Sequence, residues 1–224
     1  MGSRLEGRRI LLTQAQEYMG PAFSQAFRDE GAEVIEDNRD MAQPASADEA
    51  LADAGVIDVL VANLAAPADA DYAVKVSDER WARLFDALVH PLHRLVRGAL
   101  PAMIERRAGK ILVVGSATGL RAAPGTAPYS AARAAQVGYV RSVGVEAARF
   151  NVQINLIAQH FVENPAYFSE AFQQTEAFAG LMKEVPVGRL ARAEEDAALA
   201  VFLASNESDF FVGQAIPFAG GWVS

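Results

Sequence analysis

Short runs of apolar residues without polar alternation recur along the chain, and amphipathic stretches separate them. An unbroken apolar run is typical of a strand that is covered on both faces, as in a parallel sheet. The RILL run at 9–12 and the KILVV run at 110–114 are clear examples. The pattern predicts strands at 9–12, 32–35, 57–62, 110–114 and 152–157, and a last one near 213–218.

The stretches between these runs show the three- and four-residue spacing of helices. Phe23, Ala26 and Phe27 share one helical face, and Pro21 precedes them, where a helix start favours proline. Ser77 can accept a hydrogen bond from an unpaired amide at the start of a later helix. We expect helices at 21–30, from 77 to about 106 with a kink near Pro91, at 127–150 and at 193–204, and a short helix within 40–55.

Strands and helices therefore alternate from one end of the sequence to the other. With right-handed crossovers, this order gives an α/β fold with a parallel, doubly wound sheet. We expect a Rossmann-like sheet of about seven strands with helices on both faces. At 224 residues the chain fits a single domain, 1–224.

Composition excludes several classes of partner. The formal charge of -8 would repel phosphate backbones, so we expect no nucleic acid partner. No apolar run approaches the length needed to cross a bilayer, so we expect no membrane partner. The absence of cysteine indicates a reducing, cytoplasmic location. His90, His93 and His160 lack the carboxylate motif of a zinc enzyme, so no metal site is predicted.

Ligands bind beyond the carboxyl ends of the strands in such a sheet, and three residues there form a candidate catalytic group. Ser116 follows the KILVV strand, and Tyr129 and Arg133 are four residues apart on the next helix. A nearby guanidinium favours the phenolate of Tyr129, which could then exchange a proton with a substrate hydroxyl. The Ser116 hydroxyl could stabilise developing charge on the substrate oxygen. Taken singly, each residue has a simpler interpretation. Tyr129 would be a half-buried tyrosine at a helix start, and Ser116 would cap a loop.

The Ser, Tyr and basic-residue spacing resembles the short-chain dehydrogenase/reductase superfamily over nearly the whole chain. NLAA at 63–66 and GGW at 220–222 add to the resemblance. The superfamily's motif is Tyr-x-x-x-Lys, whereas this chain has YSAAR at 129–133. The lysine that holds the nicotinamide ribose in that superfamily is thus an arginine here.

The coenzyme-binding motifs of the superfamily are altered as well. Its Thr-Gly-x-x-x-Gly-x-Gly turn reads TQAQEYMG at 13–20, with Gln14 and Tyr18 in place of two glycines. Its Pro-Gly after the strand beside the nicotinamide is replaced by Gln159 and His160. Side chains in the turn would occupy the space of a dinucleotide. These changes together predict that no cofactor is bound.

This combination resembles the halohydrin dehalogenases, whose motifs are Ser-x12-Tyr-x3-Arg and Thr-x4-Phe/Tyr-x-Gly. The chain matches both motifs, the second through Thr13, Tyr18 and Gly20. The resemblance implies a cofactor-free lyase that closes vicinal haloalcohols into epoxides, releases halide and a proton, and opens epoxides with small anions. The implied halide and substrate site comprises Thr13, Tyr18, Gly20, Thr118, Gln159, His160, Phe161 and Val162.

In that mechanism Tyr129 removes the hydroxyl proton, Ser116 holds the oxygen, and backbone amides of 159–162 face the leaving halide. The implied partners are a small haloalcohol or epoxide and an anion such as chloride, bromide, azide, cyanide or nitrite. The resemblance also implies a homotetramer, built as a dimer of dimers. Aromatic residues that could shape an apolar substrate pocket, or form a lid or subunit contact, are Phe161, Tyr167, Phe168 and Phe172.

Two other functions stay open. The first is a short-chain oxidoreductase that binds NAD(P) in an altered turn. The second is a non-catalytic Rossmann-like binding protein. A dinucleotide titration beside a haloalcohol assay separates these alternatives.

Overall fold

A computed structural model describes residues 3–67, 72–121, 123–165 and 167–223. Within these residues the sheet has six strands, all parallel, in the order β2-β1-β3-β4-β5-β6. The doubly wound parallel sheet is as predicted, and its six strands are close to the expected number of about seven. The strands are β1 (Arg9–Thr13), β2 (Glu33–Asp37), β3 (Val59–Asn63), β4 (Gly109–Ser116), β5 (Val152–Gln159) and β6 (Ala215–Phe218).

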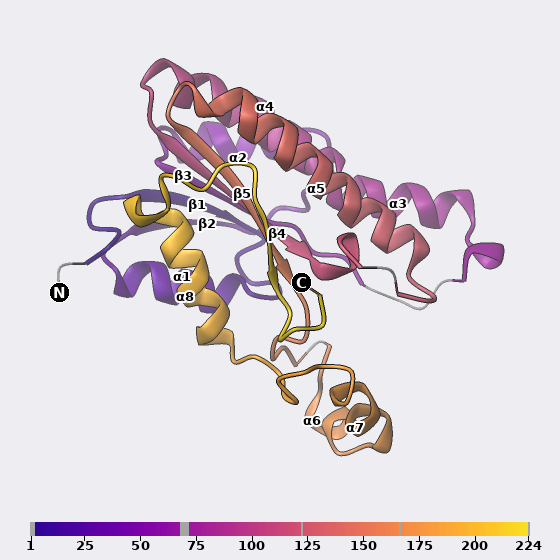
Figure 1. Ribbon diagram of the computed structural model, residues 1–224. Helices are drawn as coiled ribbons and strands as arrows, with labels where there is room; N and C mark the ends of the chain where they lie inside the picture. Colours follow the sequence, from indigo (N-terminus) through magenta and orange to yellow (C-terminus); the bar gives the residue numbers. More distant parts are fainter. Residues whose placement is uncertain (1–2, 68–71, 122, 166, 224) are drawn as a thin grey trace.

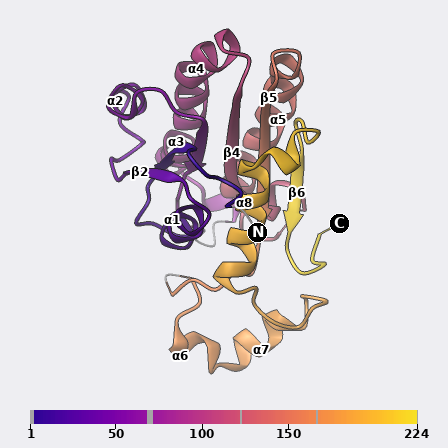
Figure 2. The ribbon, with the colours of Figure 1, turned by 90° about the vertical axis from the view of Figure 1, so that its left-hand side faces the viewer.

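Helices cover both faces of the sheet (Figure 1). One face packs against α1 (Gly20–Asp29) and α8 (Ala193–Ala204). The opposite face packs against α2 (Ser46–Ala54), α3 (Asp78–Leu88), α4 (His90–Glu105) and α5 (Ala127–Ala148). Two short helices, α6 (Glu170–Gln173) and α7 (Glu176–Met182), project beyond one end of the sheet (Figure 2). Three 3-10 turns complete the described elements: η1 (Ala73–Lys75), η2 (Ala117–Gly119) and η3 (Asn206–Ser208).

The long helix expected from 77 to about 106 is divided at its proline. Ser77 caps α3, and its hydroxyl accepts a hydrogen bond from the Arg80 amide at 3.2 Å. The helix ends at Leu88, and α4 begins at His90 with Pro91 in its first turn. Proline is favoured in the first turn of a helix because the amides there have no acceptor within the helix. The amide hydrogen that proline lacks is therefore not missed. The predicted cap and the predicted kink are both confirmed.

The buried strands explain the unbroken apolar runs in the sequence. Every residue of β3 and β4 is buried, because each strand has neighbours on both sides and helices on both faces. Phe23 and Phe27 have no exposed surface, which confirms the helical face predicted from their spacing. Among the described residues no helix is both long and apolar enough to cross a membrane.

The parallel arrangement brings the ends of the central strands together at one edge of the sheet. Ser116, the last residue of β4, is paired in register with Gln159 at the end of β5. Asn63 ends β3 beside Val114 of β4. Residues far apart in the chain therefore meet at this carboxyl edge, on the side of the sheet where α6 and α7 project (Figures 1 and 2).

Candidate active site

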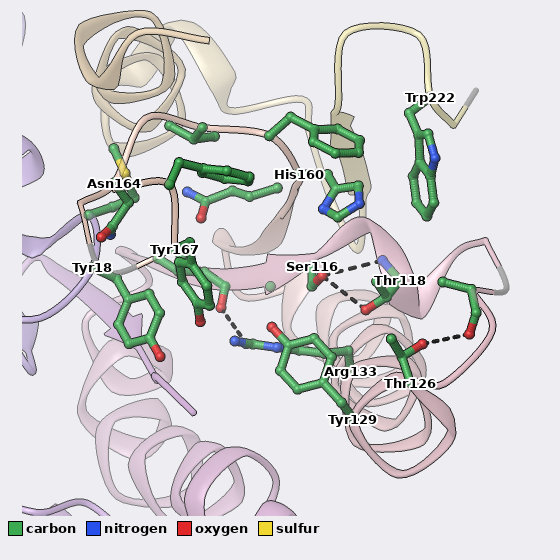
Figure 3. Close-up of a pocket in the computed structure, with 18 of the residues that line it drawn as sticks. Tyr18, Ser116, Thr118, Thr126, Tyr129, Arg133, His160, Asn164, Tyr167 and Trp222 are labelled. Carbon is green, nitrogen blue, oxygen red and sulfur yellow. Dashed lines mark hydrogen bonds between the residues drawn. The ribbon is translucent and has the colours of Figure 1, made fainter. Parts of the chain in front are cut away.

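A cavity of about 320 Å³ lies at the carboxyl edge of β3, β4 and β5. Ser116, Tyr129 and Arg133 all line it (Figure 3). The structure thus brings together the three residues that the sequence singled out as catalytic. A cavity of this volume accommodates a small ligand and encloses most of its surface.

Ser116 is held at the point where β4 turns into η2. It is buried, and its Oγ accepts a hydrogen bond from the Thr118 amide at 3.3 Å. The same oxygen shares a hydrogen bond of 3.0 Å with Thr118 Oγ1. Ser116 therefore caps the turn, as the simpler interpretation had it, and also lines the cavity. Thr118, expected in the substrate site, lines the same cavity.

Tyr129 lies in the first turn of α5, which begins at Ala127 with Pro128 next to it. Only 6% of Tyr129 is exposed, and its ring packs in the core that α5 shares with the sheet. Its hydroxyl points toward the cavity (Figure 3). The helix start thus fixes the phenol next to Ser116.

Arg133 is buried one turn further along α5, and uncharged oxygens hold its guanidinium. One nitrogen donates to the Val114 carbonyl and to Gln136 Oε1, each at 3.0 Å. The other terminal nitrogen donates to the Leu64 carbonyl at 3.2 Å. The central carbon of the guanidinium is 5.1 Å from the centroid of the Tyr129 ring. The positive charge is therefore fixed beside the phenol, and these acceptors do not neutralise it.

Gln136 completes the arrangement, although the sequence analysis did not identify it. It has no exposed surface, and its Nε2 donates to the Leu88 carbonyl at 2.8 Å. Leu88 is the last residue of α3, so Gln136 links Arg133 to the end of that helix. Its position three residues after Arg133, on the same helical face, was the available signal.

His160 and Phe161 form another wall of the cavity, as expected. The ring centroid of His160 lies 3.8 Å from that of Phe161 and 4.3 Å from that of Trp222. Burial, with a smaller effect from Arg121, lowers the pKa of His160 to about 4. The imidazole is therefore neutral at physiological pH and offers a hydrogen-bonding edge to the cavity.

Of the segment 159–162, which was expected to supply backbone amides to an anion, the His160 amide is already used within the protein. It donates to the Phe218 carbonyl at 3.0 Å, because the chain still pairs with β6 at this point. Gln159, Phe161 and Val162 line the cavity together with His160. Phe161 has a φ of 56°, a left-handed conformation that is unusual for a bulky residue.

Trp222 closes the end of the cavity opposite Tyr18 (Figure 3). The Arg121 guanidinium carbon lies 4.4 Å from the centroid of its ring, and Arg121 Nη1 also donates to the Trp222 carbonyl. The GGW motif indicated only a resemblance to a superfamily. It did not predict that Trp222 forms a wall of the cavity. Its position depends on contacts between residues about a hundred positions apart.

Thr13 and Gly20 were expected in the site, and the structure places neither in the cavity lining. Thr13 has no exposed surface, and its hydroxyl donates to carbonyls of β3, at 3.2 Å for Asn63. Gly20 is required by close packing, since a Cβ there would lie 2.3 Å from the Ala15 carbonyl oxygen. Both residues shape the turn after β1 instead. Tyr18, between them, does line the cavity.

A buried carboxyl group lies behind the cavity wall. Asp196 of α8 has no exposed surface, and its Oδ2 accepts a hydrogen bond from Gln159 Nε2. Its Oδ1 is buried without a hydrogen-bond partner. Burial raises the pKa of Asp196 to about 8. Nothing in the sequence singled out Asp196, because α8 appears there only as an apolar helix with an acidic start.

The rest of the lining comes from several segments of the chain, including the residues that follow β5. Tyr167 and Phe168 line the cavity as the sequence suggested, whereas Phe172 packs against Phe178 outside it. Lining residues that the sequence analysis did not assign to the site are Met19, Asn63, Leu64, Val114, Gly115, Ala123, Thr126, Asn164, Leu181, Glu184 and Trp222.

Comparison with known proteins identifies relatives over almost the whole chain. A family model described as enoyl-(acyl carrier protein) reductase matches residues 4–223. The 3-oxoacyl-[acyl-carrier-protein] reductase of Escherichia coli (strain K12) is 29% identical over 241 residues, which cover 96% of this chain and 97% of the relative. The protein of the same name from Thermotoga maritima is 30% identical over 248 residues, covering 98% and 99%.

A solved structure titled "Dehalogenation enzyme" has the same fold. Its TM-score is 0.90 at 30% sequence identity, and the match covers 98% of this chain and 100% of the other. The Rossmann-like architecture predicted from the sequence is therefore shown.

These findings correct the interpretation of the sequence as a cofactor-free lyase that acts on haloalcohols. The curated relatives are named reductases, and so is the matching family model. They support the first alternative, a short-chain oxidoreductase. The altered turn, the arginine at 133 and the replaced Pro-Gly did not suffice to predict the loss of a coenzyme, because the chain as a whole resembles reductases.

The fold, the position of Ser116 and Tyr129 in one cavity and the near-complete match thus agree. The chain belongs to the family described as enoyl-(acyl carrier protein) reductase, within the short-chain dehydrogenase/reductase superfamily.

Proposed function

We propose that the protein is an oxidoreductase that interconverts a compact alcohol and the corresponding carbonyl compound. The observation that carries the proposal is the placement of Ser116 and Tyr129 in one cavity of a chain whose curated relatives are reductases. Both side chains are buried, so a substrate oxygen between them would be shielded from water. Proton transfer to such an oxygen is the chemistry that this pair supports best.

In the reducing direction Tyr129 donates its phenolic proton to the carbonyl oxygen, and Ser116 donates a hydrogen bond to the same oxygen. A coenzyme would have to supply the hydride that converts C=O to CH–OH. The phenolate left on Tyr129 is stabilised by the guanidinium of Arg133, 5.1 Å from the ring. In the oxidising direction Tyr129 takes the proton back.

The cavity favours a compact, largely apolar substrate. Its aromatic walls are Phe161, Phe168 and Trp222, and its volume is about 320 Å³. His160 is neutral because its pKa is lowered to about 4, so it can hydrogen-bond a second polar group of the substrate without carrying charge. A small 3-oxoacyl group, of the kind named in the curated relatives, suits these dimensions.

The hydride has to come from a bound coenzyme, since no side chain of the cavity can supply one. A nicotinamide dinucleotide does not fit the turn after β1 in the conformation seen. Gln14 and Tyr18 project where glycines would leave room for phosphates, and Gln14 is bonded across the turn to Ala65 at 2.7 Å. We therefore assign no contact between a coenzyme and this turn.

The test is an oxidation assay of reduced nicotinamide dinucleotides with a panel of small ketones and 3-oxoacyl thioesters. We expect turnover with at least one member of the panel by the wild-type protein. A parallel assay measures halide release from chloro- and bromoalcohols without any coenzyme. Halide release with no coenzyme-dependent turnover would contradict the proposal.

A further inference from the structure

The buried carboxyl group of Asp196 reaches the cavity through one side chain. Asp196 Oδ2 accepts a hydrogen bond from Nε2 of Gln159, and Gln159 lines the cavity at Ser116 and Tyr129. A side-chain amide has a donor end, the NH₂ group, and an acceptor end, the carbonyl oxygen. Because Asp196 holds the donor end, the Oε1 acceptor is the end that Gln159 has left for a ligand.

The sheet fixes the backbone at this contact. Gln159 pairs in register with Ser116 of β4 on one side and with Phe218 of β6 on the other. The segment that follows is tied to the residues before α8, since the Ala191 amide donates to the Phe161 carbonyl at 2.8 Å. The terminal amide of Gln159 is therefore the part that can turn, and the torsion of such an amide is broad.

Gln159 is also a neighbour of the oxygen that Ser116 would hold. Residues paired in register on parallel strands carry their side chains on the same face of the sheet, and neighbouring strands lie about 4.8 Å apart. A carbonyl oxygen bound at Ser116 thus has the Gln159 side chain beside it. Gln159 is placed to contact a polar substituent on the carbon next to that carbonyl.

The two protonation states of Asp196 require opposite orientations of the Gln159 amide. A carboxylate only accepts hydrogen bonds, so ionised Asp196 needs the Nε2 donor, and Oε1 faces the cavity. A neutral carboxyl group has a proton to donate, and Oε1 is the acceptor that Gln159 can supply. The amide then turns, and Nε2 faces the cavity. Without that turn the proton would lie on Oδ1, which is buried without a partner, and an unpaired buried donor is costly.

The surroundings of Asp196 allow both protonation states. α8 packs against α1, β4 and η3, and it contacts β5 through Asp196. The titratable residues of these neighbours and of the segment just before α8 are Arg28, Asp29, Lys110, Arg189, Arg192 and Glu207. Arg189 and Arg192 pair with Glu195. Burial alone raises the pKa of Asp196, to about 8, so the group changes charge within the range where proteins are assayed.

We infer that Asp196 is a positioning residue that sets, through Gln159, whether the cavity offers a substrate a hydrogen-bond acceptor or a donor. With Asp196 ionised, the acceptor selects carbonyl compounds that carry a hydroxyl group next to the carbonyl. With Asp196 neutral, the donor serves hydroxyl and ether oxygens alike. The inference deepens the proposed function and rests on it for the choice of a carbonyl substrate.

The test compares hydroxyacetone with methoxyacetone, which is its methyl ether and lacks the hydroxyl donor. Ligand-observed NMR measures binding of each ketone, and oxidation of NADH and NADPH measures turnover, at about pH 6 and about pH 9, on either side of the pKa. The ratio of the two ketones cancels any pH dependence that they share. We expect the preference for hydroxyacetone to rise about fivefold from the lower to the higher pH, the worth of one hydrogen bond.

Two variants separate the positioning role from a structural one. Asp196→Asn cannot ionise, so its preference should change by less than about 1.5-fold between the two pH values. Gln159→Met keeps the length of the side chain without the amide and should show no preference at either pH. Glu194→Gln makes the same chemical change as Asp196→Asn at an exposed residue of α8, and it should keep the rise seen in the wild type. Circular dichroism shows whether each variant is folded.

The outcomes distinguish this inference from the proposed function. A constant preference in the wild type, a rise that persists in folded Asp196→Asn, or no binding of either ketone refutes the positioning role. Turnover of either ketone in those cases leaves the proposed function standing. A pH-dependent preference in binding with no turnover of any ketone supports the positioning role and refutes the proposed function.

Discussion

The carboxyl edge of the sheet has two halves that differ in how their side chains are used. At the end of β4, Ser116 and Tyr129 occupy ordinary backbone conformations and turn polar groups toward a cavity. In the turn after β1, Gln14 and Tyr18 occupy left-handed conformations and turn their side chains against the protein. The catalytic half is open to a ligand, and the turn half is closed by its own residues.

The difference shows that the turn after β1 can be altered while Ser116, Tyr129 and Arg133 still line one cavity. Tyr129 packs in the core shared with α2 to α5, whereas Ala15 and Met19 of the turn pack in the core shared with α1 and α8. The turn can therefore change without moving Tyr129. This independence explains why the lost glycines were misleading as an indicator of function.

The strongest test of the catalytic half is removal of the phenolic hydroxyl. Tyr129→Phe should lower turnover by about 10²- to 10⁴-fold, the usual contribution of general acid–base catalysis. Steady-state kinetics and circular dichroism check activity and folding. Tyr139→Phe is the matched control on the same helix, outside the cavity lining, where the hydroxyl contacts His93 at 3.3 Å. Equal activity of the two variants would remove Tyr129 from the mechanism.

The free energy of unfolding should also be sensitive to substitution of Arg133 in the catalytic half. Arg133→Ala leaves the carbonyls of Val114 and Leu64 without their donor, and a buried unpaired group costs about 1–3 kcal/mol. We expect the free energy of unfolding to fall by about 2–4 kcal/mol in urea denaturation. Arg97→Ala, an exposed arginine of α4, should stay within about 0.5 kcal/mol of wild type. A similar loss in both variants would contradict the argument.

The free energy of unfolding should depend on pH through Asp196 of α8. The pKa of Asp196 is raised to about 8 by burial, so the folded state holds a proton that the unfolded chain releases above its lower, ordinary pKa. The free energy of unfolding therefore decreases as pH rises from about 4 to about 8, by up to about 1.4 kcal/mol per pH unit.

Asp196→Asn keeps the shape of the side chain and removes this titration. The free energy of unfolding of this variant, relative to that of wild type, should rise by at least about 1 kcal/mol between pH 5 and pH 8. Denaturant titrations at several pH values measure it. Asp53→Asn is the control, because Asp53 is an exposed carboxylate of α2. A difference that does not change with pH would show that Asp196 is ionised in the folded protein.

The smallest expected effect concerns the strained turn itself. Gln14→Gly relieves a left-handed conformation but loses the bond to Ala65, so the net change in stability should be within about 1 kcal/mol. Gln16→Gly, two residues away and outside the left-handed region, has no strain to relieve and should lose about 0.5–1 kcal/mol. Thermal unfolding measures both. A larger loss for Gln14→Gly would mean that its side chain contributes more than the strain costs.

Much of the architecture could be predicted because it depends on local patterns. The apolar runs identified the buried strands, and Ser77 and Pro91 marked a helix start and a helix break that the structure has. The spacing of Tyr129 and Arg133 sufficed to place them on one helical face. These features require only the periodicity of a helix or strand, which a sequence carries directly.

Other features of the site depend on which elements pack together. Thr13 was expected in the cavity. Because β1 lies beside β3, the Thr13 hydroxyl instead donates a hydrogen bond to a carbonyl of β3. Gln136 matters only because α3 ends next to α5. Asp196 is unusual only because the packing of α8 buries it beside Gln159. None of these neighbours is close in sequence.

By itself the sequence determined a parallel α/β fold and the Ser116, Tyr129 and Arg133 group, because hydrophobic periodicity and short spacings are local properties of a chain. Tertiary structure alone decided that Tyr18 meets Tyr167, that Trp222 closes the cavity and that Asp196 is buried. Contact, burial and the resulting shifts in pKa arise from long-range packing, and packing brings together residues whose separation along the chain carries no record of it.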